Sequence, residues 1–466
     1  MSRRWHGLGV AVTVSALVVA SNGCADAART RVADAHAGSA AATSSPPPSW
    51  YGYHGNPART GYDPHVPAPS TLRRRWSAAL DGAVYGQPLV VSGTVIVAAE
   101  NDSLYGLALG TGAVRWHTKL GAAVGGSQLP CGDIDPVGVT GTPVYDPSTH
   151  RLFVVALVRT SSSVAHVLVA VDPANGRQLF RRRVDVPGLD PAAMNQRGAL
   201  AVSHGRVYVP FGGNYGDCGN YRGAVVASNE NGRGSLLRYV VPTPREGGIW
   251  SAGGIAVDAK GNLYVSVGNG AVGTGGGVYD GSDSVTKLST TLHRIGIFAP
   301  STWAAENDAD RDLGSTSPLL IGSYVWIQGK SRNGYLLQQG DLGGVGNPFR
   351  SVSGACASQF GGAAAHRNVI YAPCTNGLRQ IVIGSDGTPR AGWRAPGNVT
   401  GSPVVGGGVV WSLDVGAGTL YALGEANGQT RATFSVGAVS RFASPTLAGG
   451  LVLIPTMQGV TALVGA

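Results

Sequence analysis

The stretch GQPLVVSGTVIVAAENDSLYGLALGTGAVRWHTKLG, residues 86–121, contains four runs of β-forming residues separated by turn residues. The runs are PLVV, TVIVAA, SLYGLAL and AVRWHTKL, and Gly, Asn, Asp, Ser and Thr fill the breaks between them. Short apolar runs of about four to eight residues bounded by such residues are typical of buried β-strands. The stretch therefore predicts a small antiparallel sheet of four strands.

The same unit recurs along the chain. It returns as GTPVYD…HRLFVVAL…HVLVAVDPANGRQLFRRRV from Gly141 and as GSPVVGGGVVWSLDVGAGTLYALGEANGQTRATFSV from Gly401. More diverged copies share the strand pattern and begin near Arg197, Ala252, Ser315 and Gly361. The copies start roughly 40 to 60 residues apart, which is the spacing of four-stranded propeller blades with loop insertions. No long segment shows a helical period, so we predict an all-β propeller.

The last copy, ASPTLAGGLVLIPTMQGVTALVGA, ends at Ala466 after three strands. A candidate for its missing fourth strand is LRRRWSAAL, Leu72 to Leu80, in which Trp76 takes the place of Trp116 and Phe180 in other fourth strands. A three-stranded blade would leave an open edge, whereas an N-terminal strand closes the ring. The prediction is an eight-bladed β-propeller of four-stranded antiparallel blades, closed by an N-terminal strand.

The start of the chain reads as an export signal. Ser2-Arg3-Arg4 precedes a 13-residue apolar run, residues 8–20, that is too short to span a bilayer comfortably. SNGC follows, with Gly23 before Cys24, as in a bacterial lipoprotein signal. Ordinary cleavage after Ala25-Asp26-Ala27 is the alternative.

These features divide the chain into three parts. Residues 1–24 are predicted to be a signal peptide of the lipoprotein type, with Cys24 as the lipidation site. Residues 25–49 contain almost no large apolar side chain and are predicted to be a flexible tether. Residues 50–466 form the propeller. We expect an exported protein, held at the outer face of the cell membrane by lipid alone or secreted.

Charge and composition exclude a nucleic-acid partner. The net charge is +9, but charged residues make up only 13% of the chain, and the densest basic clusters are Arg73-Arg74-Arg75 and Arg181-Arg182-Arg183. A nucleic-acid surface would need a continuous basic stripe with interleaved aromatic residues. Two short runs on predicted outer strands are solvated strand faces. We expect a monomer whose partner is a small molecule or a cell-envelope protein.

Propeller topology places several polar residues on one rim. The loop before the first strand of a blade and the loop after its second strand lie at the same face. Asp312 precedes the first strand SPLLI of the fifth blade, and Arg332 follows its second strand YVWIQGK. Trp250 and Asn269 hold the same two positions in the fourth blade. We expect all four side chains, and Asp217 with them, to converge near the central channel.

The cysteines follow the same topology. Apart from Cys24, four Cys remain, and an exported protein favours an even number of thiols. Cys356 precedes the first strand of the sixth blade and Cys374 ends its second strand, so the two lie on one rim. We predict the disulfides Cys356–Cys374 and Cys131–Cys218.

The repeat resembles that of the pyrroloquinoline-quinone (PQQ) propellers. The turns LGTGAVRW, DPANGRQLF and GEANGQTRATF are similar to that family's tryptophan-docking motif, and WYGYHGNPARTGYDP is similar to the leader of quinoprotein alcohol dehydrogenases. The resemblance covers about Trp50 to Ala466. The scaffold lipoprotein of outer-membrane assembly has the same repeats without the cofactor, so the fold alone does not choose a function.

The resemblance implies roles for individual residues. GGIWSAGGIAVDAKGNLYVSVGNG is similar to the segment whose Trp stacks under the quinone and whose Asn binds calcium, here Trp250 and Asn269. DRDLGSTSPLL implies Asp312 as the catalytic base, and GKSRNGYLL implies Arg332 as the quinone contact, with Lys330 as the other cation. In that chemistry the metal polarises the quinone, the base takes the alcohol proton and hydride moves to the quinone.

The chain also departs from the dehydrogenase pattern. No two Cys are adjacent, and no C-x-x-C-H motif for covalent haem is present. The calcium-binding Glu has no clean equivalent, and GGNYGDCGNYRG offers Asp217 or Asn214 in its place.

Each candidate has a structural alternative. Asp312 can cap turn amides, Asn269 can be a turn residue with positive φ, Trp250 can be core, and Arg332 can pair with the acidic loop. Three function classes follow. The first is a binding or scaffold propeller with a central-channel ligand site, the alternative is a PQQ- and calcium-dependent dehydrogenase of an alcohol or polyol, and the third is a binder of an extracellular polymer.

Overall fold

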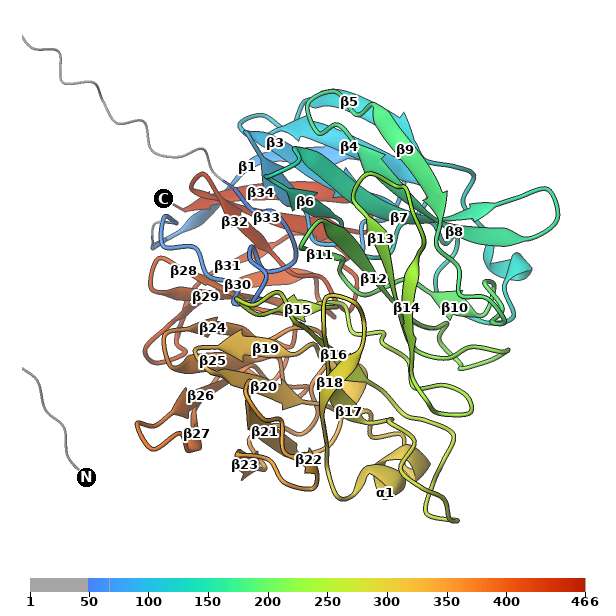
Figure 1. The fold of residues 1–466 in the computed structure, drawn as a ribbon. Helices are drawn as coiled ribbons and strands as arrows, with labels where there is room; N and C mark the ends of the chain where they lie inside the picture. Colours follow the sequence, from blue (N-terminus) through green and yellow to red (C-terminus); the bar gives the residue numbers. More distant parts are fainter. Residues whose placement is uncertain (1–48, 67, 466) are drawn as a thin grey trace, which may run out of the picture. The chain divides into compact units, whose positions relative to one another are not determined.

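The computed structural model describes residues 49–66 and 68–465, which belong to one unit, Pro47–Ala466. The predicted signal peptide, Cys24 and nearly all of the predicted tether lie outside the described residues. Within the unit the strands form eight mainly antiparallel sheets, arranged as the blades of a β-propeller (Figure 1). The predicted fold class is confirmed.

The first four blades follow one another along the chain. Blade one contains β2 (Leu89–Val91), β3 (Thr94–Ala98), β4 (Ser103–Ala108) and β5 (Val114–Lys119). Blade two contains β6 (Val144–Asp146), β7 (Arg151–Arg159), β8 (Val164–Val171) and β9 (Gln178–Arg183). Blade three contains β10 (Met194–Asn195), β11 (Ala201–Ser203), β12 (Arg206–Gly213), β13 (Ala224–Asn229) and β14 (Leu237–Val240). Blade four contains β15 (Ala256–Val257), β16 (Leu263–Val267), β17 (Ser284–Leu288) and β18 (Arg294–Ala299).

The remaining blades complete the ring. Blade five contains β19 (Leu319–Ile321), β20 (Tyr324–Gln328), β21 (Asn333–Gln338) and β23 (Arg350–Ser353), and its β22 (Gly344–Val345) pairs in parallel with β18 of blade four. Blade six contains β24 (Ala364–His366), β25 (Val369–Ala372), β26 (Arg379–Ile383) and β27 (Pro389–Arg394). Blade seven contains β28 (Val404–Gly406), β29 (Val409–Asp414), β30 (Thr419–Gly424) and β31 (Thr430–Ser435). Blade eight contains β32 (Thr446–Ala448), β33 (Leu451–Thr456) and β34 (Gly459–Gly465), with β1 (Leu72–Ala79) beside them.

Helical structure is confined to the connections. The elements are η1 (Gly126–Gln128), α1 (Trp303–Asp308) and η2 (Leu313–Ser315), and the last two lie in the crossover from blade four to blade five. Among the described residues, no helix has the length and apolar character needed to cross a membrane.

The burial of the strands follows from their place in a blade. In β3, β8 and β16 every residue is buried, because a middle strand is covered by a neighbouring blade on each face. These strands are rich in Val, Leu and Ile, which suit a sheet buried on both sides. The outermost strands β1 and β5 are mostly solvent-accessible but each buries one tryptophan. The core therefore lies between the blades rather than in a single centre.

Tryptophans of the outermost strands dock three of the blades onto the next blade. Three indole N–H groups donate to carbonyl oxygens in the neighbouring blade: Trp76 to Leu109 (2.8 Å), Trp116 to Pro173 (3.0 Å) and Trp393 to Glu425 (3.0 Å). Gly112 (φ 72°) faces Trp76, and a Cβ there would lie 2.5 Å from the indole. Only glycine fits this position, which explains the Gly in the repeated turn motif.

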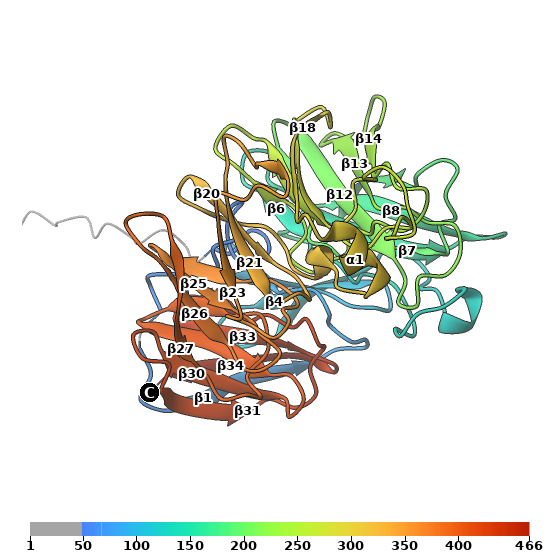
Figure 2. The ribbon, with the colours of Figure 1, turned by 90° about the horizontal axis from the view of Figure 1, so that it is seen from below.

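The closure predicted from the sequence is confirmed. β1 pairs antiparallel with β34, from Leu72 opposite Gly465 to Ala79 opposite Gly459. The two strands lie side by side in both views although they come from opposite ends of the described chain (Figures 1 and 2). Blade eight thereby has four strands.

A segment before β1 fills the central channel. We call residues 50–63 the leader. Its backbone forms hydrogen bonds with the first strands of six blades: Trp50 with Val90, Tyr51 with Tyr145, Pro57 with Val257, Ala58 with Leu320, Thr60 with Ala365, and Gly61 and Asp63 with Val405. That list covers blades one, two, four, five, six and seven, so six blades are bonded through the backbone. Side chains reach the other two, through Arg59 to Leu200 before β11 and through His54 to Ser444 before β32.

Arg59 is the residue of the leader that is most extensively hydrogen-bonded through its side chain. Its side chain is 4% exposed, and its guanidinium donates to three backbone carbonyls, those of Tyr53 (3.0 Å), Leu200 (2.9 Å) and Ile255 (2.9 Å). Burial lowers the pKa of Arg59 to about 10, which leaves it charged at neutral pH. The three carbonyls come from the leader and from blades three and four, so one side chain ties the leader to the ring.

Both predicted disulfides are present. Cys131 is bonded to Cys218 and Cys356 to Cys374, with Cα–Cα distances of 6.2 and 5.2 Å. Cys131–Cys218 joins rim loops of different blades, whereas Cys356–Cys374 joins the entrance and the second strand of blade six.

Candidate functional site

Asp312 lies at the entrance of blade five, immediately before η2, and is 6% exposed. Its Oδ1 accepts the backbone N–H of Asn269 (2.8 Å) and faces Trp250 Nε1 at 3.4 Å. Its Oδ2 is paired with Lys330 Nζ at 2.6 Å. Blades four and five thus supply all the partners of this carboxylate. Burial raises the pKa of Asp312, and the Lys330 ammonium opposes that rise.

Lys330 bridges two carboxylates. Its ammonium lies 2.5 Å from Asp310 Oδ1 and 2.6 Å from Asp312 Oδ2, and its backbone N–H donates to the Asp312 carbonyl. Burial lowers the pKa of Lys330, but the two carboxylates outweigh it and raise the pKa above its ordinary value. Asn269 Nδ2 also donates to Asp310 Oδ1 (2.8 Å). Lys330 therefore offsets part of the negative charge of the acidic loop.

The structure brings four of the predicted residues together, namely Trp250, Asn269, Asp312 and Lys330. Asn269 is not among the residues with positive φ, so the turn alternative does not apply to it. Trp250 is half-buried, and its ring packs edge-on against Phe442 with 6.2 Å between centroids. It is therefore neither a fully buried core residue nor isolated at the surface.

Arg332 does not join this cluster. Its side chain is exposed, and its Nη2 lies 3.9 Å from where a Cβ would stand on Gly354. Gly354 follows the outermost strand β23, so the guanidinium is directed toward the edge of the blade, while Lys330 is directed inward. Among the described residues Arg332 has no ion pair with the acidic loop, because Lys330 holds that position. A quinone contact for Arg332 stays a prediction that this geometry does not favour.

Asp217 lies near Glu246, beside the Asp312 cluster. It is exposed, its carboxylate accepts the Tyr221 hydroxyl, and its carbonyl accepts Arg245. Burial raises the pKa of Glu246, and Asp217 and Asp312 add to the rise, so these carboxylates share one electrostatic environment. No direct contact joins Asp217 to Asp312 in the described chain. Its metal role stays a prediction.

The residues fit a calcium ion poorly. No group of three His, Cys, Asp or Glu side chains in residues 49–66 and 68–465 is placed to hold a metal. Asp310 and Asp312 are both paired with Lys330, which a divalent cation would have to displace. Asn269 Oδ1 is buried without a hydrogen-bond partner, but one neutral oxygen is far from the set a hard cation requires. Asn214, the other candidate, donates its amide to the Ala192 carbonyl.

Five residues that the sequence analysis did not predict hold the same position in their blades. Each lies four residues before the first strand of its blade, at the channel mouth: Tyr85, Thr140, Arg197, Phe360 and Phe442. Four of them line a cavity of about 10 Å³ whose floor is Tyr53 of the leader. That volume holds about one water molecule. Aligning this position across the copies would have found them.

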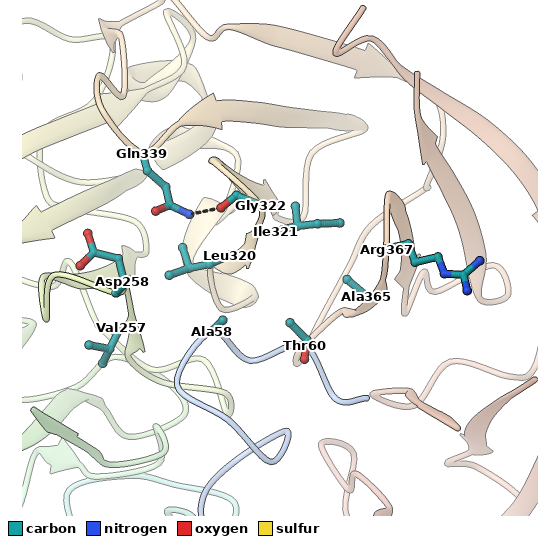
Figure 3. Close-up of a pocket in the computed structure, with 11 residues that line it drawn as sticks. Ala58, Thr60, Val257, Asp258, Leu320, Ile321, Gly322, Gln339, Ala365 and Arg367 are labelled. Carbon is teal, nitrogen blue, oxygen red and sulfur yellow. Dashed lines mark hydrogen bonds between the residues drawn. The ribbon is translucent and has the colours of Figure 1, made fainter. Parts of the chain in front are cut away.

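A larger depression, of about 340 Å³, lies elsewhere (Figure 3). It is lined by Ala58 and Thr60 of the leader and by the hairpin turns between the first two strands of blades four, five and six, with Asp258 and Arg367 at its sides. The Asp258 carboxylate already accepts backbone N–H groups of Lys260 and Asn262 (2.9 Å each). The Asp258 carboxylate is thus committed to its own turn, and we do not assign this depression as the site.

Two buried carboxylates lie on the rim of blade one. Glu100 is 2% exposed and accepts Gly138 N–H and Thr140 Oγ1–H, whereas Asp102 is fully buried and neither of its oxygens has a hydrogen-bond partner among the described residues. Burial raises the pKa of both side chains to about 7, and Glu100 contributes to the shift of Asp102. A fully buried carboxylate without hydrogen bonds is costly when ionised.

Asp102→Asn is expected to raise the melting temperature at pH 8 and to leave it nearly unchanged at pH 4. A raised folded pKa means that Asp102 destabilises the fold progressively as the pH rises from its ordinary value of 3.8 to about 7. Asn removes the charge and tolerates the positive φ of 63° at this position. Melting curves between pH 4 and pH 8 measure the effect. Asp341→Asn, in an exposed turn, is the control. If Asp102→Asn raised the melting temperature equally at pH 4 and pH 8, the raised pKa of Asp102 would be contradicted.

Eight blades, docked tryptophans and a closing strand define an eight-bladed β-propeller, and comparisons with known proteins show what this propeller is similar to. Residues 73–278 match the family model described as outer membrane protein assembly factor BamB. No curated protein sequence matches the chain. The predicted resemblance to the PQQ-repeat propellers is confirmed at the level of the repeat and the fold.

Solved structures of two functional kinds share the fold. The quinohemoprotein alcohol dehydrogenase from Comamonas testosteroni is 15% identical, with a TM-score of 0.66, over 89% of this chain and 80% of that chain. A europium-containing methanol dehydrogenase is 16% identical, with a TM-score of 0.65, over 88% and 90%. BamB from Moraxella catarrhalis is 15% identical, with a TM-score of 0.54, over 85% and 98%. At these identities the likeness concerns the fold.

Proposed function

We propose that this protein is a binding propeller whose ligand site is the channel mouth at Trp250, Asp312 and Lys330. The observation that carries the proposal is a buried ion pair, 2.6 Å long, beside a half-buried indole. The leader is hydrogen-bonded to the first strands around the channel, so these side chains lie beside a channel that the leader occupies. A concave site with an aromatic wall and a few fixed polar groups suits a small organic ligand.

A dehydrogenase that uses PQQ is the second candidate. The fold of the quinohemoprotein alcohol dehydrogenase over 89% of this chain supports it, together with Asp312 as a buried carboxylate with a raised pKa. Against it, Lys330 occupies the carboxylates that calcium would need, and Arg332 is directed away. If PQQ binds, it supplies the hydride acceptor, while Trp250 would form a wall and Asp312 would accept a proton.

Dye-linked turnover separates the two candidates. The full-length protein is incubated with micromolar PQQ, with and without calcium, and offered primary alcohols and polyols, and reduction of an artificial electron-accepting dye is followed. We expect no reduction above that of free PQQ, because Lys330 is paired with the two carboxylates that a calcium ion would need. Turnover that disappears in Asp312→Asn while PQQ binding persists would replace the binding proposal with the enzyme.

Export and anchoring are part of the proposal. The lipoprotein-like signal over residues 1–24 and the two disulfides support an oxidising, extracytoplasmic location. We propose that a lipidated Cys24 holds the protein at the outer face of the cell membrane, as a monomer that meets a small molecule or a cell-envelope protein. Mass spectrometry of the mature N-terminus tests this, and an unmodified N-terminus at Ala28 would contradict it.

A further inference from the structure

The outermost strands of the blades carry basic residues and no acidic ones. These strands are β1, β5, β9, β14, β18, β23, β27 and β31, and each contains at least one arginine. None of the eight contains Asp or Glu. The chain holds 35 Lys and Arg against 26 Asp and Glu, so an even mixture would place acidic residues there too. The perimeter of the ring therefore concentrates positive charge.

The charge is densest where blades seven, eight, one and two follow one another. Ring closure places β1 between blades seven and one, because β1 packs against β31 and Trp76 docks it onto blade one (Figure 2). The two arginine runs, which are far apart in the sequence, thus lie on either side of blade one. We call the basic residues of these four outermost strands the perimeter arc: Arg73, Arg74, Arg75, Arg115, Lys119, Arg181, Arg182, Arg183 and Arg431.

A shared β-bulge presents one arginine in three consecutive blades. The register of the outermost strand shifts by one residue in each, and the extra residue is Arg431 in β31, Arg75 in β1 and Arg115 in β5. All three side chains are exposed. The extra residue of a bulge has no partner across the ladder, and the local bend re-aims its side chain. Three guanidinium groups therefore hold equivalent outward positions around the perimeter.

Most cations of the perimeter arc lack an internal counter-charge. Within the described chain, only Lys119 and Arg183 of the arc have a carboxylate partner, which is Asp81 at 3.7 Å and Asp185, respectively. The other seven of the nine form no ion pair with the described residues. Like charges held on neighbouring strands repel each other, and a bound anion relieves that repulsion. The arc is therefore suited to an anionic partner.

The shape of the arc favours a chain over a flat surface. The arc bends around the convex edge of the ring across four of its eight blades, so a planar membrane would meet only part of it. A flexible linear polymer can follow the curve and meet all four strands. Trp76 and Trp116 are buried against the next blade, so β1 and β5 present no tryptophan on which nucleic-acid bases could stack.

We propose that the perimeter arc binds a linear polyanion of the cell envelope, a chain that carries regularly spaced carboxylate or phosphate groups. The arc lies on the outer edge of the blades, whereas the proposed ligand site lies at the channel mouth. The inference therefore goes beyond the proposed function and does not depend on it. Binding releases counterions condensed on the polymer, which makes the affinity fall with added salt.

Polygalacturonate and its fully methyl-esterified form test the proposal, because the ester keeps the chain and removes its charge. Binding to the full-length protein is measured by titration calorimetry at several salt concentrations, with long-chain polyphosphate as the phosphate counterpart. We expect the charged polymers to bind and the ester not to bind. Trigalacturonate should bind at least about tenfold more weakly than the long chain, because it reaches only part of the arc.

The triple variant Arg75→Gln, Arg115→Gln and Arg431→Gln removes the bulge arginines. It should weaken polymer binding about tenfold or more at low salt. The slope of log affinity against log salt should also fall by about two, since each anion neutralised on a flexible chain contributes about 0.7. All three side chains are exposed, so the melting temperature should stay at the wild-type value.

A charge-matched control removes three exposed arginines from the outermost strands of blades three, four and five, as Arg238→Gln, Arg294→Gln and Arg350→Gln. It should change the affinity by less than about twofold. An equal loss in both triple variants would show attraction to the net charge alone and would overturn the assignment of the arc.

The remaining outcomes also decide the proposal. Equal binding of the methyl ester would show that charge does not recognise the polymer. Absence of binding to both polygalacturonate and polyphosphate would overturn the proposal as well. Vesicles of equal parts phosphatidylglycerol and phosphatidylcholine provide the last arm. If the arc-dependent binding were to the vesicles and not to the polymers, the partner would be a membrane surface instead.

Discussion

Arg59→Ala is expected to lower the free energy of unfolding by about 3 kcal/mol or more, since three buried carbonyls lose their donor and each unsatisfied group costs about 1–3 kcal/mol. The carbonyls belong to Tyr53, Leu200 and Ile255, which join the leader to blades three and four. A cavity in the channel adds to the loss. Urea unfolding followed by tryptophan fluorescence measures the change.

Two further variants make this result specific. Arg59→Lys keeps the charge but cannot present three donors in one plane, so it should lose much of the same stability. Arg177→Ala changes an exposed turn residue and should unfold at the same urea concentration as the wild type. If Arg59→Ala unfolded at the same urea concentration as Arg177→Ala, the leader would not be tied to the ring through this side chain.

Removing residues 1–80 is expected to make the protein aggregate. The deletion takes away β1, so the backbone of β34 becomes an exposed edge in a strand whose first five residues are buried. It also removes Trp76, which docks blade eight onto blade one, and the leader. Size-exclusion chromatography and thermal melting of the refolded protein measure the outcome.

The control deletion removes residues 1–49 only, and it should stay soluble because the leader and β1 remain. Trp76→Ala in the full-length chain tests the docking separately and should destabilise by roughly 3 to 5 kcal/mol, as for other buried tryptophans. A soluble, monomeric protein starting at Asp81 with an unchanged melting temperature would show that the ring does not need the N-terminal strand.

Much of the architecture could be predicted because it follows from patterns along the chain. The spacing of strands and glycine turns predicted the blade count, and the similarity of Trp76 to Trp116 identified the closing strand. Propeller topology then predicted which loops share a rim, and with it the pair Cys356–Cys374. Each of these inferences rests on the spacing of strands and turns or on the order of strands along the chain, and tertiary contacts do not alter either.

The candidate site was predictable only in part. Trp250, Asn269 and Asp312 meet as expected because the rim positions of two neighbouring blades are adjacent in any propeller. The sequence did not predict Phe442 and Arg441 as mouth residues, because their contacts join crossovers of different blades and no motif along the chain marks them.

The sequence by itself determined the ring, its closure and the rim on which the polar loops gather, because period and strand order are properties of the chain. Only the tertiary structure decided that Lys330 rather than Arg332 pairs with Asp312, since these cations are two residues apart and no pattern indicates which one turns inward. It also decided that the leader fills the channel around Arg59. Those outcomes depend on distances between blades, which are set when the whole ring packs together.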